Sequence, residues 1–387
     1  MKWKVRDKMN IDELRNEIDS IDEQFSKLFL KRMETAAKIA EYKKDNSLSV
    51  FDKGREREVL NKVTSYASKD TETYMRSLYL TVFDLSRSYQ KKLIGNKSAL
   101  VDKIEKAVEA SPELPDSRAT VACQGVEGAY SSLACEKLFK YPTVMYFKNF
   151  EGVFSAVNSG LCKYGILPIE NSNAGSVNEV YDLMDKYNFY INRSLKLWVS
   201  HSLLANKGAK KEDIKEIFSH RQAIEQCSNY LGELKNVKIT VCENTAAAAK
   251  AVRESGRKDV AAIGSRDCAE LYSLDILDEK IQNSDNNYTR FICISKNIEI
   301  YAGADKTSLM LVLPHKAGSL YGAIARFASL GLNLTKLESR PIAGSNFEFM
   351  FYFDIDASIY SPELRAVISE LENDCEKFTY LGSYTEE

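Results

Sequence analysis

The sequence is poor in histidine and has almost no net charge. It contains three histidines in 387 residues, and its eight cysteines form no CxxC pair, so we expect no metal and no other cofactor. Lysine plus arginine (53) nearly equals aspartate plus glutamate (55), which gives no reason to expect a nucleic acid partner. There is no apolar run near the roughly 18–20 residues that span a bilayer, and no apolar signal segment. These absences predict a cytoplasmic protein that binds neither nucleic acid nor membrane.

The first 111 residues contain no proline and only two glycines. Proline and glycine both disfavour helix interiors, so this region is expected to be all helical. Apolar residues repeat here with 4-3-4-3 spacing, at Leu14, Ile18, Ile21, Phe25 and Leu28. The repeat predicts a first helix of about 35 residues, ending near residue 44. Further helices are expected at 52–67 and 70–96, which gives an all-α domain over 1–96.

The composition and the hydrophobic pattern of the sequence change twice after the helical region. Charge and two prolines, Pro112 and Pro115, predict a linker over 97–117. From 118 to 298, apolar runs (119–123, 165–169, 200–205, 238–242, 260–263, 291–295) alternate with helical patterns (131–140, 150–160, 211–233, 245–255). This alternation predicts an α/β domain with parallel sheets, built as one large domain or two lobes. Residues 305–387 predict strands at 307–313, 333–339, 347–354 and 378–384 and helices at 320–330 and 361–373. That βαββαβ order indicates a small α+β domain.

Two cations lie on the apolar stripe of the first helix. The stripe extends by the same step to Arg32 and Lys43, and a cation on a core face is costly unless an anion pairs with it. Either carboxylates such as Glu34 and Glu41 pair with them, or the two cations hold an anionic ligand. They are about 16 Å apart along the helix and nearly in phase, so their side chains could converge on one small dianion. Arg15 is about 25 Å from Arg32 and could serve the same site only from a second chain of a dimer.

Further polar residues surround these positions. They lie near the start of the second helix and, four residues apart, on the third helix: Asp52, Arg55, Glu56, Ser86 and Gln90. With the first helix, this set resembles the all-helical chorismate mutases over residues 10–95. The resemblance implies a domain-swapped homodimer that rearranges chorismate to prephenate, a reaction that needs the folded substrate conformer and stabilisation of charge on the ether oxygen.

The resemblance also implies a role for each residue of the helical site. Carboxylate groups would be bound by Arg32, Arg55 and Arg15 of the partner subunit. Lys43 and Gln90 would donate hydrogen bonds to the ether oxygen. Asp52 and Glu56 would hold the ring hydroxyl side, and Ser86 would line the pocket. The alternative is a helical dimerisation arm without mutase activity.

Polar segments follow or begin the apolar runs of the α/β region. The ends of parallel strands are where α/β sites form, and these segments hold Glu170, Asn171, Ser172, Ser219, Gln226, Thr289 and Arg290. A glycine turn at 124–128 could bind an anion through its amide groups or be a structural turn. His220 could be a general base, although a lone histidine at a strand end more often makes a structural hydrogen bond.

Three of these motifs resemble prephenate dehydratases over about 118–298: PIENSNAGSV at 168–177, SHRQAIEQC at 219–227 and TRF at 289–291. The resemblance implies two lobes like those of a periplasmic binding protein, with prephenate in the cleft losing its ring hydroxyl and carboxylate to give phenylpyruvate. Thr289 would donate to the departing hydroxyl. Substrate binding would fall to Glu170, Asn171, Ser172, Ser219 and Gln226, with Arg290 as carboxylate partner. Val126 and Arg221 stand where the family usually has proline.

The C-terminal segment, with its predicted βαββαβ order, contains two short sequence motifs. They are the start of the first helix (Gly318, Ser319, Leu320) and a four-residue motif after the second strand (Glu338, Ser339, Arg340, Pro341). Together they resemble the phenylalanine-binding form of the ACT domain. Helix-start amides suit an amino acid carboxylate, and apolar strand faces suit a benzyl ring. The resemblance implies feedback inhibition by L-phenylalanine, and the alternative is a purely structural dimerisation module.

The three motif sets, in this order, resemble the bifunctional chorismate mutase–prephenate dehydratases of phenylalanine biosynthesis. We expect chorismate and prephenate as substrates, L-phenylalanine as effector, and a homodimer through the helical domain or a tetramer. A rival enzyme of the same architecture would prefer arogenate. A non-catalytic amino acid sensor is a third possibility, but such a protein would be expected to lack Thr289, Glu56 or Arg32, and all three are present.

Overall fold

The computed structural model describes residues 10–94, 98–112, 115–316, 318–342 and 348–387. The first residue of the strand predicted at 347–354 lies outside these ranges. Contacts divide the chain into two compact units, one of Met1–Ala99 with Ile368–Asn373 and one of Leu100–Val367 with Asp374–Glu387. In the described ranges, no helix has the length and apolar character needed to cross a membrane. The same ranges hold no group of three His, Cys, Asp or Glu side chains placed to bind a metal.

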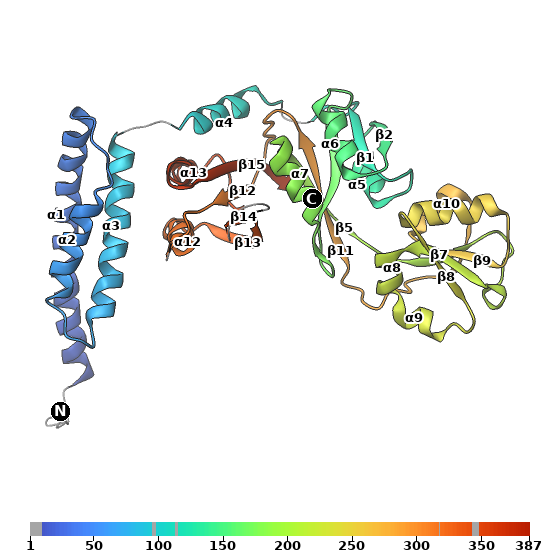
Figure 1. Ribbon diagram of the computed structural model, residues 1–387, viewed down its shortest axis with the longest axis horizontal. Coiled ribbons are helices and arrows are strands. Elements are labelled where there is room, and N and C mark those ends of the chain that lie inside the picture. The colour runs from blue at the N-terminus through green and yellow to red at the C-terminus, as the bar shows by residue number, and fades with distance from the viewer. Residues whose placement is uncertain (1–9, 95–97, 113–114, 317, 343–347) are drawn as a thin grey trace. The chain divides into compact units, whose positions relative to one another are not determined.

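The helical unit confirms the predicted long first helix, α1, which covers Ile11–Asp45. Asn10 caps it by accepting a hydrogen bond from the amide of Asp12 at 3.2 Å. Two further helices follow, α2 at Lys53–Thr64 and α3 at Glu72–Ile94, and α3 packs against both of the others (Figure 1).

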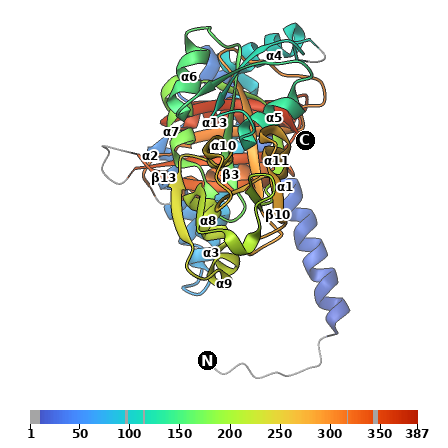
Figure 2. The ribbon, with the colours of Figure 1, turned by 90° about the vertical axis from the view of Figure 1, so that its right-hand side faces the viewer.

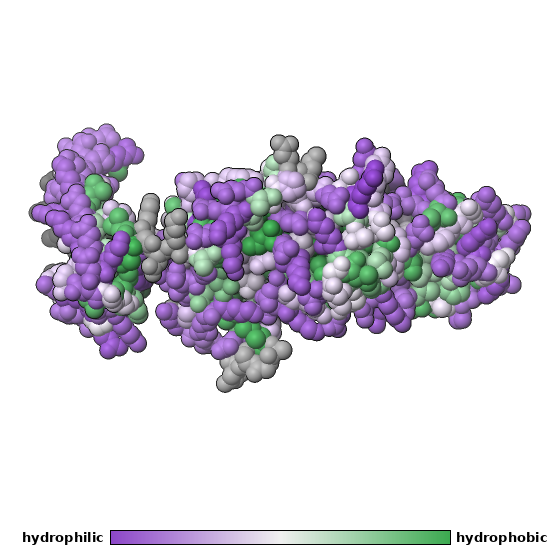
Figure 3. Space-filling model, turned by 90° about the horizontal axis from the view of Figure 1, so that it is seen from above, coloured by the Kyte–Doolittle hydropathy of each residue, from purple (hydrophilic) through white to green (hydrophobic). Residues whose placement is uncertain are grey.

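The apolar stripe of α1 remains largely exposed in a single chain. Exposed fractions are 55%, 51%, 49% and 67% for Ile18, Ile21, Phe25 and Leu28. The first turns of α1 project beyond α2 and α3 (Figure 2), and green apolar surface is visible among hydrophilic side chains on this unit (Figure 3). An exposed apolar row of this kind marks an interaction surface.

Most of the predicted linker is a helix. Residues Ala99–Ala110 form α4, with Ile104 fully buried, and Glu105 forms an ion pair of 3.0 Å with Arg365. Apolar residues at 100, 101, 104, 107 and 108 have helical spacing, which the charge and prolines of this segment obscured. The prediction of a plain linker is therefore corrected.

The first lobe of the second unit is a mixed sheet. Its main strands are β1 (Thr120–Gln124), β2 (Thr143–Phe147), β3 (Tyr164–Asn171), β5 (Tyr190–Trp198) and β11 (Tyr288–Ser295), and short β4 (Gly175–Ser176) pairs with β3. Strand β1 is parallel to β2 and β3, whereas β11 is antiparallel to both β3 and β5. The prediction of parallel sheets was thus only partly correct. Helices α5 (Tyr130–Leu138), α6 (Phe150–Asn158) and α7 (Asn178–Tyr187) pack on it, with α6 beside α7 (Figures 1 and 2).

The second lobe is built between β5 and β11. Its sheet has the order β10-β6-β9-β7-β8, with strands at Ser202–Ala205 (β6), Glu216–His220 (β7), Lys238–Cys242 (β8), Val260–Gly264 (β9) and Asp275–Asp278 (β10). A short 3-10 turn (η1, Lys211–Asp213) and helices α8 (Arg221–Gln226), α9 (Ser228–Glu233), α10 (Thr245–Ser255) and α11 (Arg266–Tyr272) complete it. The helical pattern predicted over 211–233 is wrong at β7, because an apolar run this short fits a buried strand as well as a helix.

The C-terminal segment has the predicted βαββαβ order. Its elements are β12 (Lys306–Val312), α12 (Ser319–Ser329), β13 (Asn333–Pro341), β14 (Phe349–Asp356), α13 (Pro362–Asp374) and β15 (Lys377–Glu386). Strand β15 also pairs in parallel with β5, which the sequence did not predict. The sheets of the first lobe and the C-terminal segment are therefore continuous, and they share a core that includes Ile169, Met310 and Tyr352.

Candidate functional site

The two cations of the α1 stripe lie close to residues of the neighbouring segments. Lys43 donates a hydrogen bond to the carbonyl oxygen of Val50 at 2.5 Å, and the guanidinium carbon of Arg32 lies 6.0 Å from the ring centre of Phe83 on α3. Among the described residues, neither cation forms an ion pair with Glu34 or Glu41. The structure therefore gives no support to the alternative in which carboxylates of α1 neutralise the two cations.

The predicted polar pair on α3 is buried on the helix that Arg32 contacts. The side-chain amide of Gln90 donates to the hydroxyl of Ser86 at 3.2 Å, and both residues are less than 10% exposed. The other end of this amide, Oε1, has no partner within the described part of the chain. An unpaired buried amide group is costly, so the site has unused capacity to bind a polar ligand atom.

The start of α2 supplies the remaining helical candidates. Asp52 caps the helix by accepting from the amide of Arg55 at 2.9 Å, and the Arg55 side chain pairs with Glu58 at 2.7 Å. Glu56 pairs with Arg87, which sequence reasoning did not select and which follows Ser86 on α3. Four of the eight candidates, namely Arg32, Glu56, Ser86 and Gln90, therefore lie on or contact residues 83–90 of α3.

Arg15 lies apart from this group. Its side chain is 70% exposed, and it pairs with Asp12 at 3.3 Å on its own helix. A single chain therefore does not bring Arg15 to the other candidates.

In the second unit, two sequence motifs meet where β3 ends and β11 begins. The strands pair antiparallel with Asn171 opposite Thr289. The Asn171 amide donates to the Thr289 hydroxyl at 2.9 Å and to the Tyr288 carbonyl at 3.2 Å. Its carbonyl oxygen accepts from the backbone amides of Asn173 and Ala174 at 3.1 and 2.9 Å. The Asn171 side chain is thus fixed at both ends and holds the Thr289 hydroxyl.

A chain of side-chain hydrogen bonds continues from Asn171 into the second lobe. Asn171 also donates to Asn287 Oδ1 at 2.9 Å, and Asn287 in turn donates to Gln226 Oε1 at 3.0 Å. His201 Nε2 lies 2.9 Å from the same oxygen, and burial lowers the pKa of His201. A neutral imidazole with its proton on Nε2 therefore donates to Gln226. We find no partner for Gln226 Nε2 in the described chain, so that donor is left for a ligand.

Sequence reasoning missed Asn287 and His201. Both side chains are almost fully buried. Asn287 lies two residues before Thr289, and His201 is one of three histidines, at the point where the chain crosses into the second lobe. These positions were the available signals, but only the fold shows that the two side chains share one acceptor.

Several predicted substrate-binding residues have partners within the protein. The hydroxyl of Ser219 is fully buried and donates to the Ile263 carbonyl at 3.0 Å. Ser172 donates to the Asn286 carbonyl and accepts from the Tyr288 amide. The remaining candidates face other elements. His220 adjoins α8, and burial lowers its pKa. Glu170 pairs with Lys336 at 3.1 Å, and Arg290 pairs with acidic residues of the C-terminal segment.

The glycine turn at 124–128 packs against the second lobe. Gly125 and Gly128 have φ values of 102° and 83°, and a Cβ on Gly128 would lie 2.8 Å from Leu271 Cδ2. The Tyr272 hydroxyl donates to the Glu127 carbonyl at 2.7 Å. These contacts favour the structural role of this turn, and Val126, which is partly buried, packs against the core of the second lobe.

The predicted effector residues lie on α12 and β13. Gly318 begins α12 with φ 86°, and the Ser319 hydroxyl is buried without a partner in the described ranges. Leu320 is partly buried, whereas Ser339 and Pro341 are exposed. Arg340 donates to the Asn178 carbonyl at 2.7 Å and pairs with Asp182, while Glu338 bonds to Ser176. The motif on β13 thus contacts α7 and β4 of the first lobe.

Glu386, on β15, is expected to make folding sensitive to acid. Burial would raise its pKa, but hydrogen bonds from Lys196 and Lys306 and the charge of Arg290 outweigh burial and lower the pKa to about 2. A depressed pKa stabilises the fold at pH values above the unfolded pKa near 4.3, and this stabilisation, roughly 3 kcal/mol, is lost as pH falls towards 2.

Glu386→Gln should therefore lower the free energy of unfolding at pH 7 by about that amount. The difference in the free energy of unfolding between this variant and wild type should become smaller at acid pH, as denaturant titrations at several pH values would show. The exposed Glu233→Gln is the control, and a difference that does not change with pH would contradict the assignment.

Comparisons with known proteins agree with this arrangement. The chain matches the family model of prephenate dehydratase over residues 121–299 and that of chorismate mutase type II over 14–91. A bifunctional chorismate mutase/prephenate dehydratase of Escherichia coli (strain K12) is 30% identical over 381 residues, which cover 97% of this chain and 96% of that protein. The chloroplastic arogenate dehydratase/prephenate dehydratase 1 of Arabidopsis thaliana is 38% identical over 285 residues, 70% of this chain and 72% of that protein.

A solved structure supports the fold of the second unit. The prephenate dehydratase of Arthrobacter aurescens in complex with L-Phe matches with a TM-score of 0.63 and 28% identity, over 69% of this chain and 90% of that chain. The helical unit is covered by the separate match to chorismate mutase. Since a relative of 30% identity spans nearly its whole length, the chain belongs to the family of bifunctional chorismate mutase/prephenate dehydratases.

Proposed function

We propose that this chain catalyses two consecutive steps of phenylalanine biosynthesis. The helical unit rearranges chorismate to prephenate, and the two-lobed domain at 118–298 removes water and CO2 from prephenate to give phenylpyruvate. The observation that carries the second activity is the hydrogen bond from Asn171 to Thr289, at the point where the two lobes are joined through Asn287 and Gln226.

The hydrogen bond to Thr289 also suggests how its hydroxyl acts. Because Asn171 Nδ2 donates to Thr289 Oγ1, the Thr289 proton is free to point to another acceptor. That acceptor is the departing ring hydroxyl of prephenate, which leaves more easily when it receives a hydrogen bond. The free Nε2 of Gln226 is a second donor, suited to a substrate carboxylate.

In the helical unit, Arg32 and Lys43 supply the positive charge that the dianionic substrate needs. The reaction has no covalent intermediate, so rate acceleration comes from holding the reactive conformer and stabilising charge on the ether oxygen. Lys43 and the second N–H of Gln90 Nε2, which already donates once to Ser86, are the proposed donors to that oxygen, with Asp52 and Glu56 on the ring hydroxyl side and Arg55 beside them. Arg15 of the partner subunit completes the site, and the exposed stripe of α1 supports a homodimer with two shared sites.

The C-terminal segment at 305–387 is proposed to be an ACT domain that binds L-phenylalanine. The related dehydratase of Arthrobacter aurescens was solved with L-Phe. In this chain the carboxylate of phenylalanine would be bound by amides at the start of α12, near Gly318, with residues 338–341 beside it. The two lobes at 118–298 are proposed to resemble a periplasmic binding protein that closes over its ligand.

A direct assay tests both activities. Purified protein is incubated with chorismate, and the loss of chorismate and the formation of phenylpyruvate are followed with and without phenylalanine. We expect both to occur, with phenylalanine suppressing phenylpyruvate. If chorismate stops at prephenate, the dehydratase proposal fails for that substrate. If chorismate is untouched while added prephenate is dehydrated, the helical unit is only a dimerisation arm.

Arogenate is the second candidate substrate for the cleft. It is favoured by one observation, the 38% identity to a plant protein named as an arogenate dehydratase and prephenate dehydratase. Parallel assays with prephenate and arogenate, compared through kcat/KM, decide which substrate the cleft prefers.

A further inference from the structure

The two strands that carry Asn171 and Thr289 turn their other faces to the C-terminal segment. Side chains alternate along a strand, and the next pair inward, Glu170 and Arg290, also lie opposite one another. Glu170 pairs with Lys336 on β13 at 3.1 Å. The residues adjacent to the proposed catalytic pair are therefore bound from behind by the C-terminal sheet.

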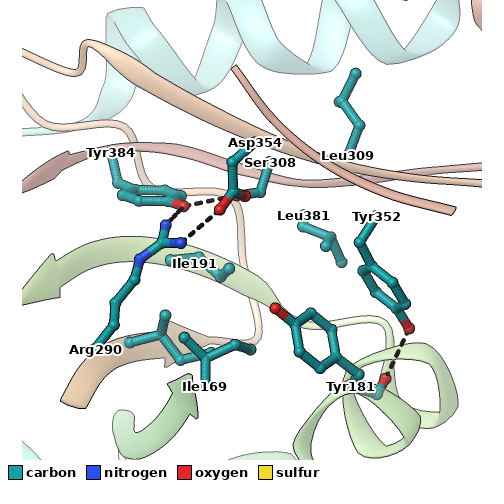
Figure 4. Close-up of a pocket in the computed structure, with 11 residues that line it drawn as sticks. Ile169, Tyr181, Ile191, Arg290, Ser308, Leu309, Tyr352, Asp354, Leu381 and Tyr384 are labelled. Carbon is teal, nitrogen blue, oxygen red and sulfur yellow. Dashed lines mark hydrogen bonds and ion pairs between the residues drawn. The ribbon is translucent and has the colours of Figure 1, made fainter. Parts of the chain in front are cut away.

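Arg290 makes the densest of these contacts. Its guanidinium is 2.5 Å from Asp354 on β14 and 2.5 Å from the Tyr384 hydroxyl (Figure 4). It is also 2.7 Å from Glu386 on β15. Arg290 is 8% exposed, and Ser308 on β12 bonds to both Asp354 and Tyr384. Two strands of the C-terminal sheet, β14 and β15, thus hold one side chain of the TRF motif, and Ser308 on β12 supports two of their contacting groups.

This arrangement leaves Arg290 poorly placed to bind substrate. Its donors already face two carboxylates and a hydroxyl, and a buried ion pair is costly to break. In contrast, its backbone neighbour Thr289 presents its side chain to the cleft, where Asn171 holds it. A small displacement of β14 or β15 would therefore act on Arg290 first and reach Thr289 through one peptide unit.

We propose that Arg290 is a positioning residue that couples the C-terminal sheet to the Thr289 hydroxyl, and that Asp354 and Glu386 transmit the phenylalanine-bound state of that sheet to the cleft through it. The inference rests on the proposed function, since it assigns the route of the proposed inhibition. It requires that the two sheet states differ in how they hold Arg290, because an effector shifts an equilibrium only through such a difference.

The chain contains its own reporter for this coupling. Of its two tryptophans, Trp198 lies on β5, where it pairs with Tyr288 next to Thr289. Its indole donates to the Asp285 carbonyl at 2.9 Å and is 44% exposed. In a Trp3→Phe background, fluorescence therefore reports on the strand end that carries Thr289, without any need for turnover.

The test compares Arg290→Gln and Asp354→Asn with the Trp3→Phe parent. We expect phenylalanine to shift Trp198 emission in the parent and at least about fivefold less in either variant, while calorimetry shows phenylalanine affinity within about threefold. Dehydratase kcat should fall about tenfold with KM changed less than threefold. The double variant should lose no more of the emission shift and of kcat than either single variant does, because both changes break the same connection. Asp354→Asn preserves the shape of the cluster, and thermal unfolding checks that each variant is folded.

The matched control is Lys377→Gln, which removes another ion pair between β15 and the first lobe, that with Asp185 on α7. It should retain the parent's emission shift and kinetics. A tenfold or larger rise in KM for Arg290→Gln, with the emission shift retained, would show instead that Arg290 binds substrate. Variants that behave like the control, or a parent whose emission does not respond to phenylalanine, would overturn the coupling. Absence of turnover in the parent would count against the proposed function alone, since the emission experiment still decides the coupling.

Discussion

Thr289→Val is expected to lower kcat for prephenate dehydration at least about a hundredfold and to leave chorismate mutase activity unchanged. Valine has nearly the shape of threonine but cannot donate a hydrogen bond to the departing hydroxyl, and positioned proton donors contribute roughly 10²–10⁴-fold to rate. Asn171 keeps two other acceptors, Asn287 and the Tyr288 carbonyl, so the cleft should remain assembled. Steady-state kinetics of both activities on one preparation provide the measurement.

Thr289→Ser is the matched control for the hydroxyl. Serine keeps the oxygen that accepts from Asn171 and the proton that the mechanism needs, so it should retain at least roughly a tenth of wild-type kcat. A valine variant with wild-type kcat would remove Thr289 from the mechanism. A variant in which only KM rises would instead assign the hydroxyl to ground-state binding, because removal of a group that acts only in the transition state lowers kcat.

The elements predicted well from sequence were those with a strong local period. The stripe at 14, 18, 21, 25 and 28 gave α1 to within one residue of its end, and the apolar run at 238–242 coincides with β8. Strand β5 was missed because its burial does not alternate: Ile191 and Asn192 are both buried, as are Ser194 and Leu195. It lies between β11 and β15 within a continuous sheet, so its environment depends on strands from distant parts of the chain.

The candidate site was predicted by residue type but not by partner. Asn171 and Thr289 are 118 residues apart, and only the antiparallel pairing of β3 and β11 brings them into contact. Arg290 shows the limit more clearly. From sequence it is a cation beside a catalytic threonine and suggests a carboxylate ligand, whereas in the fold the carboxylates are Asp354 and Glu386. No local pattern could have predicted partners on two later strands.

In the helical unit, Arg32→Ala is expected to lower chorismate mutase kcat/KM at least about a hundredfold and to leave prephenate dehydration unchanged. Arg32 lies on the α1 stripe facing α3 and has no carboxylate partner in the described chain, so its charge is available to the substrate. Removal of one such donor at a charged transition state typically costs 10²–10³-fold. The control is Arg76→Ala, an arginine on α3 that is 46% exposed and pairs with Glu72. Equal activity of the two variants would contradict a role for Arg32.

The same variant can test whether the site is shared between two chains. Arg15 and Arg32 lie on one helix about 25 Å apart, too far for both to reach one small substrate from the same chain. Arg15→Ala should therefore also lower mutase kcat/KM by about a hundredfold or more, although its side chain makes no contact with the other candidates in one chain. If equal amounts of the two variants are unfolded and refolded together, half of the dimers should be mixed. Each mixed dimer has one site with both arginines intact, so activity should return to about a quarter of wild type. If activity does not return although mixed dimers form, each chain must build its site alone, and Arg15 acts elsewhere.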